Sequence, residues 1–64
     1  MPVITIRLLE GRTPEQKREL TKVISEAVPR IANTPLDGVH VIFENVPRTD
    51  WGLGGVLWSD RPPR

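Results

Sequence analysis

Two adjoining stretches decide the fold of this chain: VITIRLL at residues 3–9 and TPEQKRELTKVISEAVPRIA at residues 13–32. The first is aliphatic except at Thr5 and Arg7, so both of its faces carry apolar side chains. That composition is typical of a strand covered on two sides. A short turn containing Gly11 then leads into the second stretch, which has the pattern of a helix.

The helix is expected to begin after Thr13 and to run to about Ala32. Thr13 is a capping residue, Pro14 suits the first helical position, and Gln16 completes a capping box. Pro29 removes one backbone hydrogen bond, so it should kink the last turn or end the helix early. One side of the helix is apolar and is made of Leu20, Val23, Ile24, Ala27, Val28 and Ile31.

The rest of the chain completes a β-α-β unit and adds a hairpin. Residues 39–45 alternate in a strand pattern, and the helical crossover implies parallel strands with a right-handed connection. Residues 47–50 form a turn-rich loop, and WGLGGVLW at residues 51–58 predicts a small hairpin whose glycines serve the turn. We therefore expect an α+β fold in a single domain over residues 1–64.

Composition excludes several classes of function. The 64 residues carry nine basic and eight acidic side chains, which gives no reason to expect nucleic acid or an anionic membrane as a partner. There is no cysteine, and one histidine alone makes no metal site, so neither a disulfide framework nor a metal centre is expected. No apolar run approaches the roughly 20 residues of a spanning helix. The first seven residues lack a signal-peptide layout, so we expect a cytoplasmic protein.

The small size predicts self-association. A chain of this length buries only about 60% of its unfolded surface, and two strands with one helix are not independently stable. Disulfides and metals, the other means of stabilising small domains, are not expected here. The uncovered sheet face and two exposed tryptophans, Trp51 and Trp58, are expected to pack on copies of the same chain.

Pro2 is the first candidate for chemistry. Once Met1 is removed, which we expect in the mature chain, Pro2 presents a free secondary amine. Ordinary α-amino groups titrate near pH 8, and burial or a nearby cation lowers that value. Such an amine can act as a general base near neutral pH, although many chains begin Met-Pro without any such role.

Three other residues have both a functional and a structural interpretation. Arg12 follows the first strand, where a guanidinium can clamp a carboxylate, or it is simply a solvated turn residue. His40 can donate a hydrogen bond to a substrate oxygen, or it is a structural strand histidine. Trp51 can form the apolar wall of a pocket, or it packs within the hairpin.

These residues together resemble the 4-oxalocrotonate tautomerase family of the tautomerase superfamily. The resemblance is carried by MPVI at residues 1–4, LEGRTPEQK at 9–17, PL at 35–36 and WGLGG at 51–55. It runs from Pro2 to about residue 59 without an evident gap. Each motif alone is weak, but their combination at these separations is specific.

The resemblance implies a homohexamer built from dimers that isomerises 2-hydroxydienoates to conjugated keto acids. It implies no cofactor and no metal, a small enol or keto acid as substrate, and a role in the breakdown of aromatic hydrocarbons. Pro2 is then the catalytic base, and Arg12 binds the far carboxylate of the substrate. Trp51 supplies the apolar wall, and Leu9 and His40 complete the substrate-binding set. Sites form between subunits, so Arg12 and His40 are expected to come from different chains.

One position departs from the family pattern and keeps other functions open. Members of this type carry a second arginine where this chain has His40, and histidine offers fewer donors to a carboxylate. A non-catalytic oligomeric homologue is one alternative. A hydratase or dehalogenase of the superfamily is another, but such relatives tend to carry a paired arginine where this chain has Leu9.

Overall fold

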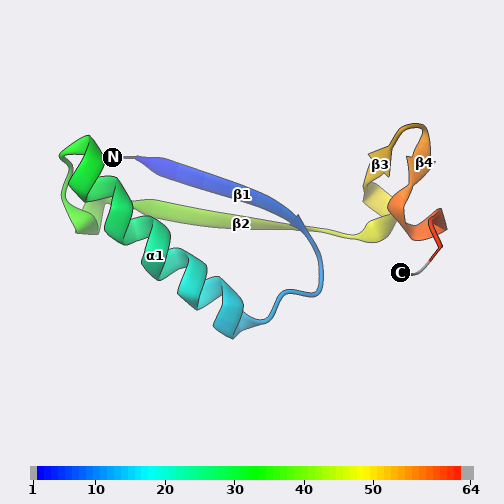
Figure 1. Ribbon diagram of the computed structural model, residues 1–64, viewed down its shortest axis with the longest axis horizontal. Coiled ribbons are helices and arrows are strands. Elements are labelled where there is room, and N and C mark those ends of the chain that lie inside the picture. Colours follow the sequence, from blue (N-terminus) through cyan, green and yellow to red (C-terminus); the bar gives the residue numbers. More distant parts are fainter. Residues whose placement is uncertain (1, 63–64) are drawn as a thin grey trace.

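The β-α-β unit forms as expected. The computed structural model describes residues 2–62, so Met1 and its expected removal lie outside the described residues. Strand β1 (Val3–Leu9) leads to helix α1 (Pro14–Ala32) and then to strand β2 (His40–Val46) (Figure 1). β1 and β2 pair in parallel, with Val3 opposite His40 and Leu9 opposite Val46. The expected parallel pairing is confirmed, and β2 is displaced by only one residue from the predicted strand.

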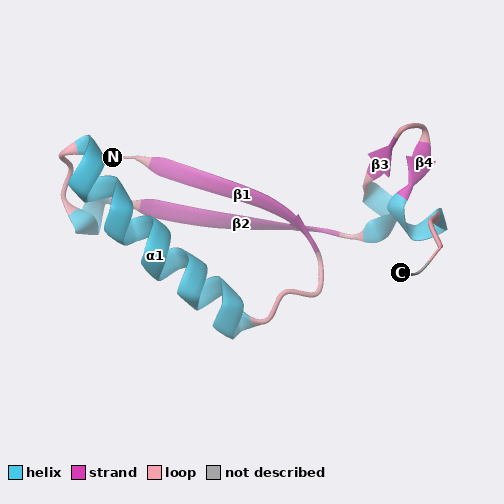
Figure 2. Cartoon of the chain, viewed as in Figure 1, coloured by secondary structure: helices cyan, strands magenta, loops and turns pink. Residues whose placement is uncertain are grey.

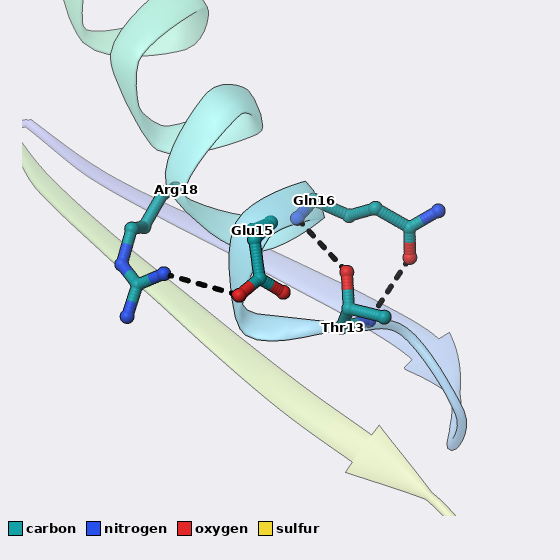
Figure 3. A network of polar contacts seen from close by, with 4 residues as sticks. All are labelled: Thr13, Glu15, Gln16 and Arg18. Atoms are coloured by element: carbon teal, nitrogen blue, oxygen red, sulfur yellow. Dashed lines mark hydrogen bonds and ion pairs between the residues drawn. The ribbon is translucent and has the colours of Figure 1, made fainter.

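The start of α1 is fixed by the predicted capping box. The Thr13 hydroxyl accepts a hydrogen bond from the Gln16 backbone N–H at 3.2 Å, and the Gln16 side chain accepts one from the Thr13 N–H at 2.9 Å (Figure 3). Glu15 and Arg18 form an exposed ion pair at 3.7 Å on the same turn. At the other end, Asn33 caps the helix in the left-handed conformation, with φ of 54°.

Pro29 does not end the helix early. α1 continues through it to Ala32, so that part of the expectation is wrong. Pro29 lies in the last turn of the helix, where it withholds only one N–H from the ladder and little helix remains to be disrupted.

The C-terminal hairpin is confirmed and is small. Strand β3 (Gly52–Leu53) pairs antiparallel with β4 (Val56–Leu57). Gly54 and Gly55 form the turn with φ of 63° and 85°, and two positive values in succession are what a two-residue hairpin turn of the I′ type requires. The turn-rich segment expected before the hairpin contains a short 3-10 helix, Arg48–Asp50.

No residue from 2 to 62 is buried from solvent. Helix α1 covers one face of the sheet, and the side chains between them are only half-buried: Ile4, Ile6, Leu8, Val41 and Phe43. The opposite sheet face is open, with Val3 57% exposed and Ile42 47% exposed. The hairpin stands away from the β-α-β unit, which gives the chain an elongated shape of 43 × 23 × 15 Å (Figure 2). The fold therefore lacks a core of its own.

The two tryptophans are not exposed as expected. Both are half-buried, at the two ends of the hairpin. The Trp58 backbone N–H donates to the Trp51 backbone carbonyl at 2.7 Å. The Arg61 guanidinium lies 5.4 Å from the centre of the Trp58 ring. Arg61 also donates to the Leu53 carbonyl at 2.9 Å. The exposed apolar groups here are instead Leu53, Val56 and Leu57.

Removing the helix cap should weaken the protein measurably. Thr13→Ala deletes the hydroxyl that accepts the Gln16 N–H, so we expect the free energy of unfolding to fall by about 1 kcal/mol. Urea titration at one fixed protomer concentration measures the change. Thr49→Ala, at an exposed position, is the matched control. An equal loss in the two variants would show that the cap contributes nothing specific.

Candidate functional site

Pro2 and His40 lie together at one end of the sheet. The His40 backbone N–H donates to the Pro2 carbonyl at 3.0 Å, which extends the parallel ladder by one step beyond Val3. Pro2 is half-buried, and His40 is exposed at the first position of β2. The geometry therefore places His40 beside the proline of its own chain.

Leu9 and Arg12 lie at the opposite end of the same strand. Seven residues of strand at about 3.3 Å per residue put Leu9 roughly 23 Å from Pro2. An arginine side chain is far too short to span that gap. The structure therefore does not bring Arg12 to the Pro2 of its own chain.

The backbone around Arg12 is fixed on both sides. The Glu10 N–H donates to the Val46 carbonyl at 3.0 Å, and Thr13 is held by the capping box. Gly11 has a φ of 113°, a conformation that side-chain-bearing residues rarely adopt, and it turns the chain away from the strand. Arg12 is therefore an exposed side chain on a positioned loop.

Trp51 stands apart from both pairs of residues. It precedes β3 in the hairpin region, which stands away from the β-α-β unit beyond the Leu9 end of the sheet (Figure 1). The five predicted residues are thus distributed over three places: Pro2 with His40, Leu9 with Arg12, and Trp51 alone. One copy of the chain therefore does not bring these five residues together.

Two hollows flank helix α1. One, of about 410 Å³, is lined by Arg12 together with Gln16, Glu19, Leu20 and Val23. The other, of about 510 Å³, lies between α1 and β2 over Val41 and Phe43, and the Lys17 ammonium is 5.9 Å from the centre of the Phe43 ring. Neither hollow includes Pro2.

An ion pair on the open sheet face was not anticipated from the sequence. Arg7 and Glu44 are opposite each other in the parallel register, and the Arg7 Nε donates to the Glu44 Oε2 at 2.7 Å. This hydrogen bond, with the carboxylate charge, raises the pKa of Arg7. The signal was present as opposite charges on two predicted strands, but only the register shows that they meet.

Residues 2–62 contain neither a metal-binding cluster nor a membrane-spanning helix. In this range no group of three or more His, Cys, Asp or Glu side chains is arranged to hold a metal ion. Over the same residues, no helix has the length and apolar character needed to cross a membrane.

Comparison with known proteins identifies the family. The model of the family described as "Tautomerase enzyme" matches residues 2–61. The chain belongs to the tautomerase family. This membership makes it an isomerase of the tautomerase type, and the predicted β-α-β protomer with a C-terminal hairpin matches the solved structures.

Individual relatives are similar over nearly their whole length. A probable tautomerase of Listeria monocytogenes is 45% identical over 60 residues, covering 94% of this chain and 98% of the relative. The 2-hydroxymuconate tautomerase of Stutzerimonas stutzeri is 44% identical over 55 residues, covering 86% and 87%.

Solved structures give the same result and add information on assembly. A crystal structure of a 4-oxalocrotonate tautomerase homologue superposes with a TM-score of 0.93 at 44% identity, covering 98% of this chain and all of the other. A heterohexameric 4-oxalocrotonate tautomerase from Chloroflexus aurantiacus superposes with a TM-score of 0.86 at 38% identity, covering 94% and 97%.

Proposed function

We propose that this tautomerase ketonises 2-hydroxydienoate acids of the 2-hydroxymuconate type, with the Pro2 nitrogen as general base. The observation that carries the proposal is the position of Pro2. It is half-buried directly before β1 and beside His40, in a chain similar to 2-hydroxymuconate tautomerases. The proposal requires that Met1 be removed, because an amide nitrogen is not a base.

The reaction needs one proton transferred twice. The Pro2 nitrogen takes the proton of the substrate's 2-hydroxyl, and the oxygen becomes a carbonyl as the double bonds shift. The protonated proline then returns the proton to a carbon of the former dienol. The amine ends as it began, so the cycle needs no cofactor, and a base that titrates near the working pH serves both steps best.

Arg12 of a second copy supplies the carboxylate clamp. Within the described residues β1 pairs only with β2, so the other edge of β1 is free. An antiparallel two-fold pairing of two β1 edges would bring the Pro2 end of one copy to the Leu9 end of the other. Arg12 would then reach the partner's site, where its guanidinium can hold a substrate carboxylate with two hydrogen bonds.

The apolar flank of α1 supports this two-fold arrangement. Leu20 and Val23 are 41% and 57% exposed, and they line the hollow that also contains Arg12. That flank is on a different side of α1 from the groove over β2. One neighbouring copy can therefore cover the strand edge and the helix flank together, and this contact would also remove water from the site.

His40 sets the strength of anion binding at the Pro2 end. Arg7 is the nearest alternative cation on that strand, but its Nε is held by Glu44 at 2.7 Å. A histidine offers fewer donors than an arginine to an oxyanion or a carboxylate. We therefore assign His40 a single hydrogen bond to substrate oxygen, with Trp51 and Leu9 as apolar neighbours of the bound acid.

Replacing the proposed base should abolish most turnover. Pro2→Ala is expected to lower kcat/KM for 2-hydroxymuconate about a hundredfold or more, since a positioned general base contributes at least that much. The loss of ultraviolet absorbance of the enol measures the rate, and intact mass shows which residue begins each chain. Pro47→Ala is the matched proline control. Equal activity in Pro2→Ala and the wild type would contradict the assignment.

Two inactive variants should restore activity when mixed. If Pro2 of one copy works with Arg12 of another, half of the dimers from an equal mixture of Pro2→Ala and Arg12→Gln are mixed, and each has one intact site. Refolding the two together should therefore give about a quarter of wild-type activity. Arg18→Gln mixed with Pro2→Ala is the control, because it shows how activity changes when active chains are only diluted by inactive ones. No recovery above the separate variants would mean that both residues act within one chain.

Restoring a guanidinium at position 40 should change substrate choice. His40→Arg is expected to raise kcat/KM for the dicarboxylate 2-hydroxymuconate by about tenfold or more, because two hydrogen bonds replace one. The monocarboxylate phenylenolpyruvate should change by less than about threefold, because it lacks the second carboxylate. Equal gains for both acids would show that position 40 acts on the shared enol group instead.

A further inference from the structure

The open face of the sheet has one charged pair among less polar neighbours. Four register pairs face away from α1: Val3 with His40, Thr5 with Ile42, Arg7 with Glu44, and Leu9 with Val46. Val3 and Ile42 are about half exposed. The helix lies on the opposite side of the sheet (Figure 2).

This pair contributes little to an isolated chain. The Arg7 and Glu44 side chains are 72% and 46% exposed, and ion pairs in that setting are largely offset by solvation and side-chain entropy. A covered pair behaves differently. Two charges that satisfy each other are tolerated in an interface, whereas one left without its partner after burial strongly opposes association.

Nothing in the described part of the chain covers this face. The hairpin stands away from the sheet, α1 occupies the other side, and no residue from 2 to 62 is buried. The positive and negative groups on this face pair with each other, so the face can be covered without leaving either charge alone. A second copy of this chain is the occupant that fits, because symmetric packing sets the same patch against itself.

We propose that Arg7 and Glu44 form a polar lock on this face, where the sequence predicts that copies of the chain pack, and that the lock excludes copies in which one charge is missing or the two charges are reversed. The lock is separate from the β1 edge contact that completes the active site. It concerns which copies assemble, and it does not depend on what the enzyme converts.

The lock explains why partner choice is possible on a small surface. Relatives in this family include a heterohexamer, so copies that differ in sequence do associate in some members. An apolar face alone discriminates poorly between similar partners. A tethered ion pair adds a penalty for any partner that strands one of its charges, and such penalties provide specificity.

Single and double replacements test the lock. Arg7→Met and Glu44→Leu should each raise the protomer concentration at half-dissociation by at least about a hundredfold, since each strands one charge. The double variant R7M/E44L should assemble at least as well as the wild type. Light scattering after gel filtration over a dilution series gives the mass. The exposed Glu15–Arg18 pair offers the matched controls Arg18→Met and Glu15→Leu, which should not change assembly.

Circular dichroism separates dissociation from unfolding in the same samples. A single variant that is dissociated supports the lock, whether helical or unfolded, provided that R7M/E44L assembles. Arg7→Met that assembles at wild-type concentrations overturns the proposal, and so does a double variant that stays dissociated. Because the readout is mass, a failed lock would not be confused with a failed assignment of Pro2.

A charge-swapped variant tests partner choice directly. R7E/E44R keeps the pair within each chain but reverses its direction. It should assemble with itself and fail to exchange with wild-type copies, as judged by native mass spectrometry of mixtures. Free mixing of the two would show that the pair acts only within its own chain and would overturn the selective role.

Discussion

Everything in this structure depends on the fact that one helix on a two-stranded sheet cannot enclose a core. A helix covers only one face of a sheet, and the side chains between them remain open at both edges. The result is a protomer in which no described residue reaches full burial. Since hydrophobic burial is the main favourable contribution to folding, the stability of such a chain must come largely from contacts between copies.

The same constraint determines where the chemistry lies. In a parallel β-α-β unit the starts of both strands are at one end and the loop after the first strand is at the other. Pro2 and His40 therefore share one end, and Arg12 is held at the far end by Gly11 and the helix cap. No adjustment of side chains within one copy closes a gap of roughly 23 Å. If Pro2 and Arg12 act on one substrate, as we propose, association with a second copy is needed for catalysis as well as for stability.

Much of the fold was predictable because local rules and the tertiary structure agree. The capping box at Thr13 and the paired glycines at positions 54 and 55 act through local backbone geometry. The helix start and the hairpin turn can therefore be predicted without knowing which residues pack nearby. The helix continues to Ala32 as predicted, and Pro29 does not end it early, because the cost of an interior proline depends on how much helix follows it. The exposure of the tryptophans was misjudged because it depends on tertiary neighbours, such as Arg61 beside the Trp58 ring.

The candidate site, like the fold, was predictable only in part. Residue types and their spacing gave Pro2 and Arg12, but their separation by the length of β1 follows only from the topology. The Arg7–Glu44 contact depends on register, since a shift of one residue in either strand would move the charges to opposite faces of the sheet. A pair so sensitive to alignment is a poor source of stability in water and a good means of distinguishing correct from incorrect packing. The strand that follows the proposed base directly therefore also carries, at Arg7, the group that we propose selects its neighbours.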